Sequence, residues 1–131
     1  MQLSIQTIKA AHNRIKPYII NTPIKSDKEI NYLVDADVYF KCENLQNSGS
    51  FKFRGASNAV FSLNDEEARR GVITVSSGNH GTALSLAAKN RGIPATVILP
   101  SNATKYKKNL IEELGANIII CEPTVKSREK T

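Results

Sequence analysis

Residues 71–121 decide the fold of this chain, and they read GVITVSSGNHGTALSLAAKNRGIPATVILPSNATKYKKNLIEELGANIIIC. Three short runs of aliphatic and β-branched residues predict strands at 72–75, 95–99 and 117–121. Between them, two longer stretches ended by glycine predict helices at 82–90 and 104–114. Strands and helices that alternate in this way form right-handed β-α-β units. The predicted fold class is therefore α/β, an open parallel sheet with helices on both faces.

Upstream, residues 4–16 have apolar positions at helical spacing, which predicts an amphipathic helix with Ser4 as its N-cap and Pro17 as its end. A second, short helix is expected around residues 28–33. Residues 38–43 alternate between apolar and polar side chains, as a half-buried strand requires. The sequence shows no close partner for that strand.

The chain breaks at residues 47–50, and a helix is expected to begin near Phe51 or Lys52 with Ser50 as its cap. The expected apolar stripe of this helix consists of Ala56, Ala59, Val60 and Leu63.

A charged cluster at residues 66–70 marks the expected domain boundary. It separates an N-terminal part, residues 1–68, from a β-α-β part, residues 69–131. Residues 125–130 have the pattern of the first turns of a further helix. We therefore expect the second part to be incomplete at its C-terminus.

The composition is that of one soluble globular domain, with 131 residues, 40% of them hydrophobic and 23% charged. The net charge is +6, but the basic residues are scattered and do not alternate with aromatic ones, which disfavours nucleic-acid binding. The longest apolar runs, such as residues 118–121, fall far short of the ~18 residues of a membrane span. Residues 2–9 lack an apolar secretory core. These features predict a cytoplasmic protein.

Cys42 and Cys121 lie far apart in apolar stretches, and no C-x-x-C pair or histidine cluster accompanies them. We expect both to be buried thiols in a reducing compartment. The sequence also shows no pair of carboxylates, no Ser-His-Asp order and no spacing of metal ligands. Hydrolysis and zinc chemistry are therefore disfavoured.

Residues 76–81, Ser-Ser-Gly-Asn-His-Gly, follow a predicted strand and precede a predicted helix. In an open parallel sheet, ligands bind beyond the carboxyl ends of the strands, where a helix N-terminus offers free N–H groups. The loop can therefore clamp an anion or a carboxylate. The alternative is that Gly78 and Gly81 only make a tight turn, which Ser or Asn caps. The glycine spacing fits neither G-x-G-x-x-G nor the P-loop.

Lys52 lies between two phenylalanines at the expected start of a helix. Apolar neighbours and the positive end of a helix both favour a neutral, nucleophilic amine, as in a Schiff-base lysine. The alternative is a solvated helix lysine, as most lysines in this chain must be. We expect Arg54 to be a structural ion-pair partner and His12 to be structural. His80 alone is a weak indication, since a histidine beside glycine often closes a turn.

Two motifs together are more specific than either alone, namely residues 50–55, Ser-Phe-Lys-Phe-Arg-Gly, and residues 76–81. In this combination the chain resembles the serine/threonine dehydratase and serine racemase family, the fold-type II pyridoxal-phosphate enzymes. The resemblance implies that residues 1–68 are the start of a large cofactor-binding domain and residues 69–131 most of a small domain. It extends over nearly the whole chain, through residues 21–23 and 40–43 to 115–116 and 121–123.

The resemblance also implies roles for individual residues. Lys52 is expected to hold pyridoxal 5′-phosphate covalently as an internal aldimine and to act as base on one face of the substrate α-carbon. Phe51 is expected to pack beside the cofactor ring, and Asn79 to bind its ring hydroxyl. The substrate carboxylate is expected to be received by Ser76, Asn79 and His80.

The residue at position 77, here Ser77, differs between the branches of the family. The racemase branch uses serine there as the acid or base on the opposite face, whereas dehydratases have alanine, so Ser77 favours the racemase-like branch. Thr82 departs from the glutamine expected after this motif, at a position that should point into the helix.

The activity implied by the resemblance is the elimination of water from L-serine or L-threonine, as in an ammonia-lyase, or the racemisation of these amino acids. The alternative is an inactive truncated remnant that acts at most as a small-ligand-binding or dimerising module. The longer family members imply a homodimer, a glycine-rich loop for the cofactor phosphate, and a divalent cation. The residues that bind this cation are not expected in this chain.

Overall fold

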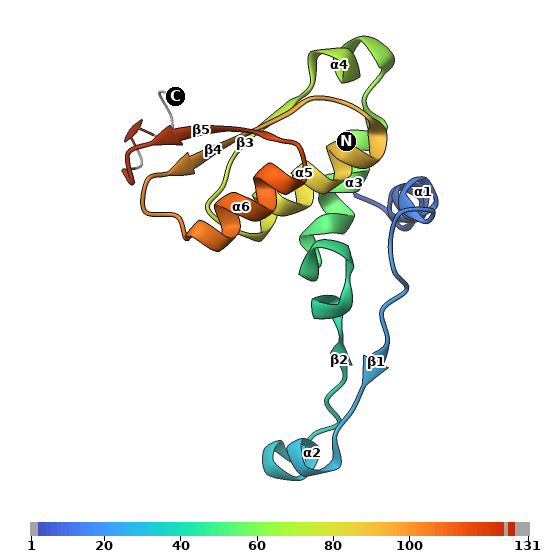
Figure 1. The fold of residues 1–131 in the computed structure, drawn as a ribbon. Coiled ribbons are helices and arrows are strands. Elements are labelled where there is room, and N and C mark those ends of the chain that lie inside the picture. The colour runs from blue at the N-terminus through green and yellow to red at the C-terminus, as the bar shows by residue number, and fades with distance from the viewer. Residues whose placement is uncertain (1–2, 125, 128–131) are drawn as a thin grey trace.

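The computed structural model of the protein describes residues 3–124 and 126–127, and the region after residue 71 alternates strands with helices (Figure 1). The strands are parallel and lie in the order β3-β4-β5, so the predicted α/β class with a parallel sheet is confirmed. The elements are β3 (Val72–Val75), α5 (Asn79–Arg91), β4 (Ala95–Pro100), α6 (Lys105–Glu113) and β5 (Asn117–Cys121).

The largest departure from the predicted bounds is the start of α5. This helix begins at Asn79, three residues before the predicted start at residue 82. The reason is that Ser76 closes its first turn, since the Ser76 hydroxyl accepts hydrogen bonds from the backbone N–H groups of Gly78 and Gly81. The loop that carries the polar residues and the helix that follows are therefore one continuous unit.

The core of this region lies between the sheet and the helices α5 and α6. Val97 and Leu99 of the central strand β4 are fully buried, together with Ile111 of α6. Figure 1 shows α5 and α6 on the same side of the sheet, as two successive right-handed crossovers require. In the part of the chain that the structure describes, helices therefore cover one of the two faces that we expected them to cover. Ile73 and Val75, on β3, are exposed.

The helix α3 (Lys52–Ser62) packs against α5 and connects the two halves of the chain. Phe53, Ala56 and Val60 share a buried cluster with Ala83 and Ala87 of α5. This packing crosses the expected boundary between residues 68 and 69. The start of α3 and the polar loop before α5 are thus parts of one packed body.

The predicted stripe of α3 is partly wrong. Ala56 and Val60 are buried as expected, but Ala59 is exposed. Phe53 and Ser57 take its place on the buried face. The cause is the helical period of 3.6 residues, which places positions three, four and seven after the buried Phe53 on one face.

Ser50 does not cap α3, so this prediction is wrong. Phe51 already has helical backbone angles at the N-cap position and makes no side-chain cap. The N–H groups of Phe53 and Arg54 donate instead to the carbonyl oxygens of Ser50 and Phe51. The Ser50 hydroxyl is buried and has no hydrogen-bond partner among the described residues.

The first helix, α1 (Ile5–Ile15), is confirmed with Ser4 as its N-cap, and the side chain of Thr7 completes a capping box. It packs against α3. The charged residues before β3 form a helix that the sequence analysis did not predict, α4 (Asp65–Arg70). Asn64 caps this helix, again in a capping box.

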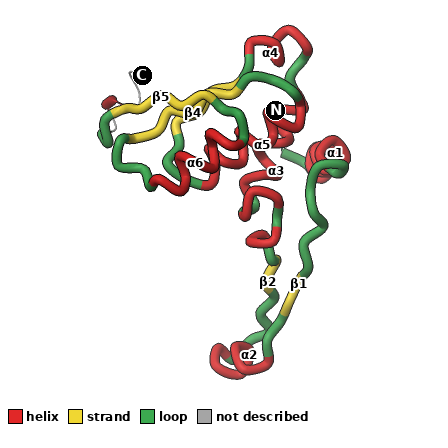
Figure 2. The backbone as a smooth tube through the Cα atoms, viewed as in Figure 1, coloured by secondary structure: helices red, strands yellow, loops and turns green. Residues whose placement is uncertain are grey.

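Residues 24–41 form an arm that extends away from the rest of the molecule (Figures 1 and 2). Strand β1 (Ile24–Lys25) pairs with β2 (Phe40–Lys41) in antiparallel orientation, and α2 (Lys28–Val34) lies between them. The expected strand at 38–43 is therefore shorter, and it does have a close partner, because α2 reverses the chain. Both β2 residues are exposed rather than half-buried, since the described arm has only one layer. Two 3-10 turns follow, η1 (Glu43–Leu45) and η2 (Asn47–Gly49).

The two cysteines differ in burial. Cys121 is buried at the end of β5, as expected. Cys42 is only half-buried, so the expectation of a buried thiol is wrong for this residue. The reason is that Cys42 directly follows β2, the short exposed strand of the arm.

Of the helix expected at residues 125–130, Lys126 and Ser127 are helical, and the other positions lie outside the described residues. None of the described helices is long and apolar enough to cross a lipid bilayer.

Two glycines with positive φ allow a test of the turn that starts β3. Gly71 has φ 81° and ψ −172°, and a Cβ there would lie 2.7 Å from the carbonyl oxygen of Pro94. Gly92 has φ 72° and ψ 35°, with open space around such a Cβ. We expect Gly92→Ala to lower the free energy of unfolding by about 1 kcal/mol and Gly71→Ala by about 3 kcal/mol or more. Urea unfolding measures both, and equal losses would contradict the close approach to Pro94.

Candidate functional site

The loop at residues 76–81 lies at the carboxyl end of β3, and Ser76 fixes its shape. The Ser76 hydroxyl oxygen lies 3.2 Å from the Gly78 nitrogen and 3.0 Å from the Gly81 nitrogen. The Ser76 N–H in turn donates to the carbonyl of Ile98 on β4. Ser76 therefore caps α5, which is the structural role that the sequence analysis kept as the alternative for this loop.

Other polar groups of the loop remain free. The backbone N–H groups of Ser77, Asn79 and His80 have no acceptor within the described part of the chain. The side chains of Ser77 and Asn79 are exposed, and that of His80 is half-buried. Free donors at the positive end of a 13-residue helix attract an anion. The loop thus has the features of a carboxylate-binding site in addition to its turn.

Gly81 lets neighbouring elements approach this loop closely, and Gly78 has a charged neighbour. A Cβ at Gly81 would lie 3.1 Å from Val97 and 3.4 Å from Ile111, so the glycine allows α5 to pack tightly on β4 and α6. A Cβ at Gly78 would lie 3.7 Å from the Lys107 ammonium nitrogen. Lys107 thus brings a positive charge to the loop from the first turn of α6. Nothing in the sequence indicated that Lys107 lies beside this loop.

Lys52 is the first residue of α3, and α3 begins at the same end of the helix pair as α5. At the opposite end, Arg91 of α5 donates hydrogen bonds to the carbonyl oxygens of Val60 and Leu63, where α3 ends. The two helices have 11 and 13 residues, and η2, directly before α3, also contacts α5. The first turns of both helices therefore lie at one end of the body, on the side of the loop 76–81.

The expected apolar enclosure of Lys52 is wrong for the described residues. Phe53 is fully buried in the core, but Phe51 points outward and is 62% exposed. Lys52 itself is exposed and forms no hydrogen bond or ion pair with the residues described. The helical period is the reason, since neighbouring residues 51, 52 and 53 project about 100° apart around the axis.

Glu43 and Arg54 form the strongest polar interaction near Lys52. The Arg54 guanidinium donates two hydrogen bonds to the Glu43 carboxylate, at 2.8 and 2.7 Å. Thr22 donates a third at 2.6 Å. The hydrogen bonds from Arg54 outweigh the effect of burial and, with that from Thr22, lower the pKa of Glu43 from 4.5 to about 2. The structural role expected for Arg54 is confirmed, whereas its partner Glu43 was missed.

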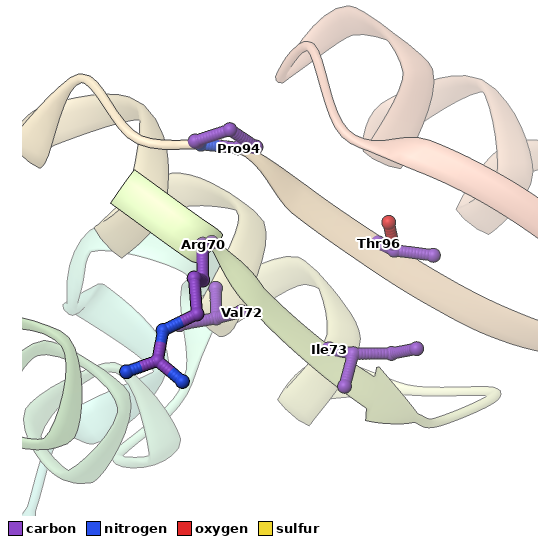
Figure 3. Close-up of a pocket in the computed structure, with 6 residues that line it drawn as sticks. Arg70, Val72, Ile73, Pro94 and Thr96 are labelled. Carbon is purple, nitrogen blue, oxygen red and sulfur yellow. The ribbon is translucent and has the colours of Figure 1, made fainter. Parts of the chain in front are cut away.

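Two surface hollows lie away from the loop 76–81. One, of about 270 Å³, lies between Arg70, Ile73, Pro94 and Thr96, at the amino ends of β3 and β4. Figure 3 shows the side chains that line this hollow. It lies at the opposite ends of the strands from the loop 76–81. Another hollow is lined by His12 and Arg54, between α1 and α3. In the described ranges, no three His, Cys, Asp or Glu side chains gather as metal ligands.

The chain matches known proteins along most of its length. Residues 15–131 match the family of pyridoxal-phosphate dependent enzymes. The sequence is 52% identical to a beta-hydroxyaspartate dehydratase from Paracoccus denitrificans over 93% of this chain and 39% of that protein. It is 51% identical to a serine racemase from Arabidopsis thaliana over 96% of this chain and 38% of that protein.

Solved structures show the same similarity. The serine racemase of Dictyostelium discoideum superposes with a TM-score of 0.92 at 48% identity, over 98% of this chain and 42% of the other. The chain thus spans about two fifths of the length of these relatives.

The low pKa of Glu43 predicts a pH-dependent contribution to stability. A depressed folded-state pKa stabilises the fold above pH 4.5, and this contribution is lost as the pH falls from 4.5 to about 2. We expect Glu43→Gln to lower the free energy of unfolding by about 1.5–3 kcal/mol at pH 7. The difference from the unmodified chain should shrink towards pH 2 in urea unfolding.

Glu66→Gln is the matched control, because Glu66 pairs with Arg70 on the surface of α4. Its effect should stay within about 0.5 kcal/mol at every pH. If the difference between the unmodified chain and Glu43→Gln did not depend on pH, the assignment of the low pKa to Glu43 would be wrong.

Proposed function

The chain belongs to the family of pyridoxal-phosphate dependent enzymes, with serine racemases and dehydratases as relatives, and we propose that it supplies the cofactor lysine and the substrate-binding loop of a PLP-dependent racemase or ammonia-lyase. The observation that carries this proposal is that α3 and α5 begin at the same end of the helix pair. There the exposed Lys52 begins one helix, and the other begins with Asn79 and His80, whose N–H groups, like that of Ser77 just before the helix, have no acceptor among the described residues. The chain spans about two fifths of the length of these relatives, and we propose for it a share in this activity rather than the whole of it.

The residues near Lys52 fit an added group. Ser48 and Ser50 precede Lys52, and their buried hydroxyls have no partner among the residues described. Lys52 forms no hydrogen bond or ion pair with the described residues, so its ε-amine is free to condense with an aldehyde. Phe51 projects outward beside it, as a side chain that packs on a cofactor ring must. The proposal therefore keeps Lys52 as the covalent attachment point and Phe51 as the ring neighbour.

When bound, pyridoxal phosphate supplies an electron-accepting ring that stabilises negative charge on the substrate α-carbon. The residues of this chain then bind the substrate and move its protons. Asn79 and His80 hold the substrate carboxylate with their side chains and free N–H groups, and Asn79 also binds the ring hydroxyl of the cofactor. The Lys52 amine, once the substrate amine has displaced it from the cofactor, would take the α-proton from one face.

Ser76 has a different part in this proposal from the one that the resemblance implied. Because its hydroxyl is already occupied by the N–H groups of Gly78 and Gly81, it acts mainly by shaping the loop around the carboxylate. Ser77 has a free, exposed hydroxyl, which suits the delivery of a proton to the opposite face. Loss of the substrate hydroxyl gives elimination, and a proton from Ser77 gives racemisation.

We propose L-serine and L-threonine as substrates. The relative from Paracoccus denitrificans acts, by its name, on hydroxyaspartate, which carries a second carboxylate. The Lys107 ammonium beside Gly78 favours this substrate class as an alternative. We propose no metal ligand among the described residues, and a divalent cation would need ligands from outside them.

Cofactor binding tests the proposal directly. We expect added pyridoxal phosphate to give the long-wavelength absorbance band of an imine, and borohydride reduction to fix the label on the peptide that contains Lys52. Lys52→Ala should abolish both signals. Lys105→Ala, which removes an exposed lysine of α6, should leave both unchanged. Label distributed over many lysines, or a band that survives Lys52→Ala, would refute the proposal.

A second candidate function is a non-catalytic module that binds a small ligand or dimerises. The arm favours it, because Tyr32 and Leu33 of α2 are 87% and 79% exposed and Tyr39 is 68% exposed. Apolar side chains gathered at one tip mark an interaction surface.

Association through the arm can be measured by sedimentation velocity. We expect the chain to form dimers at micromolar to millimolar concentrations and Leu33→Asp to shift the equilibrium towards monomers by about tenfold or more. Lys28→Asp, at the other end of α2, serves as the control. A chain that stays monomeric throughout, without a response to small carboxylates, would exclude this second candidate.

A further inference from the structure

The N-terminus of α3, which carries Lys52, lacks the usual side-chain cap. Its N-cap residue Phe51 makes no side-chain hydrogen bond to the helix. The two residues Ser48 and Gly49 have φ angles of 65° and 71°, so the chain enters the helix through a left-handed turn. A non-glycine residue in that conformation is strained by about 1 kcal/mol or more and persists only where its surroundings hold it. The position of Lys52 must therefore be fixed by contacts from outside the helix.

Arg54 provides these contacts from the first turn of α3. Its Nε and Nη2 atoms donate to the two oxygens of Glu43, at 2.8 and 2.7 Å. The same Nη2 donates to the carbonyl oxygen of Ile20, at 3.2 Å. The side chains of the pair are 27% and 15% exposed, so water screens them only partly. This planar, forked geometry is available to arginine and not to lysine.

Glu43 is itself held in place by the segment before the arm. Thr22 donates to its Oε1 at 2.6 Å. The buried side chain of Gln46 accepts from the N–H of Ile20 and donates to its carbonyl oxygen, both at 2.9 Å. The segments 20–22 and 43–46 are thus joined to each other and, through Arg54, to the first turn of α3.

We propose that Glu43 and Arg54 are positioning residues for Lys52. Their ion pair fixes the first turn of α3, so that the lysine amine stays at the end of the helix pair where the loop 76–81 lies. Neither residue is expected to contact substrate or cofactor. The inference rests on the proposed function of Lys52, but the geometry it asserts can be measured without any cofactor.

The first test measures position. Spin labels on Lys52→Cys and Ser77→Cys, in a chain that also carries Cys42→Ser and Cys121→Ser, report the distance between α3 and the loop by electron paramagnetic resonance. We expect one narrow distance distribution when the ion pair is intact and a clearly broader one with Glu43→Gln or Arg54→Lys. Glu66→Gln, which breaks the exposed pair on α4, should leave the width unchanged. Circular dichroism confirms for each variant that the chain is folded.

The second test measures how readily the Lys52 amine reacts with the cofactor aldehyde. Pyridoxal phosphate trapped with borohydride gives the ratio of label on Lys52 to the low background label on the exposed Lys105 of the same chain. We expect Glu43→Gln and Arg54→Lys to lower this ratio roughly 10- to 100-fold, because small displacements of a reacting group are costly. The internal reference corrects for any general change in lysine exposure.

The outcomes separate the inference from the proposed function. An unchanged distance distribution in the folded variants overturns the positioning role, whatever the labelling shows. A broader distribution with an unchanged labelling ratio also overturns it, since Lys52 would then need no positioning. If pyridoxal phosphate does not label Lys52 in the unmodified chain at all, the proposed function is wrong. The distance measurement alone then decides whether the Glu43–Arg54 ion pair positions residue 52.

Discussion

The packing of α3 against α5 is the interaction on which the rest of the structure depends. Phe53, Ala56 and Val60 meet the alanines Ala83 and Ala87, whose small side chains let the two helices approach closely. Burial of a phenylalanine side chain contributes about 1.5–3 kcal/mol. Because Arg91 ties the far ends of the helices together, this contact also determines where their first turns lie. The first turn of α3, with Lys52, and the first turn of α5, after the loop 76–81, therefore lie at the same end of the helix pair.

The loop shows how one sequence motif serves structure and chemistry together. Ser76 and Gly81 are used by the fold, the first as the cap of α5 and the second for close packing on β4. Among the described residues, the backbone N–H groups of Ser77, Asn79 and His80 have no acceptor and are therefore available to a ligand. The tight structural turn that the sequence offered as one alternative is thus present, and it leaves free the donors that the other alternative, a turn that binds an anion, would need.

The sequence predicted the second half of the fold well because its hydrophobic pattern is local. The strands at 72–75 and 117–121 were predicted with their observed bounds, since each is a short β-branched run between clear turn residues. The first half was predicted less well, because its contacts join distant segments. The pairing of residues 24–25 with 40–41 and the Glu43–Arg54 ion pair have no periodic pattern that would reveal them. The outward direction of Lys52 could not be predicted either. The sequence alone does not show which of the two flanking phenylalanines is buried, and this decides the direction of the lysine between them.

We propose that the amine of Lys52 and the loop 76–81 face one ligand. A crystal structure of the chain soaked with pyridoxal phosphate would show whether they do. We expect density continuous with the Lys52 Nζ atom, with the ring next to Phe51 and Asn79. Density attached to another lysine, or a Lys52 side chain directed into solvent away from residues 76–81, would contradict it.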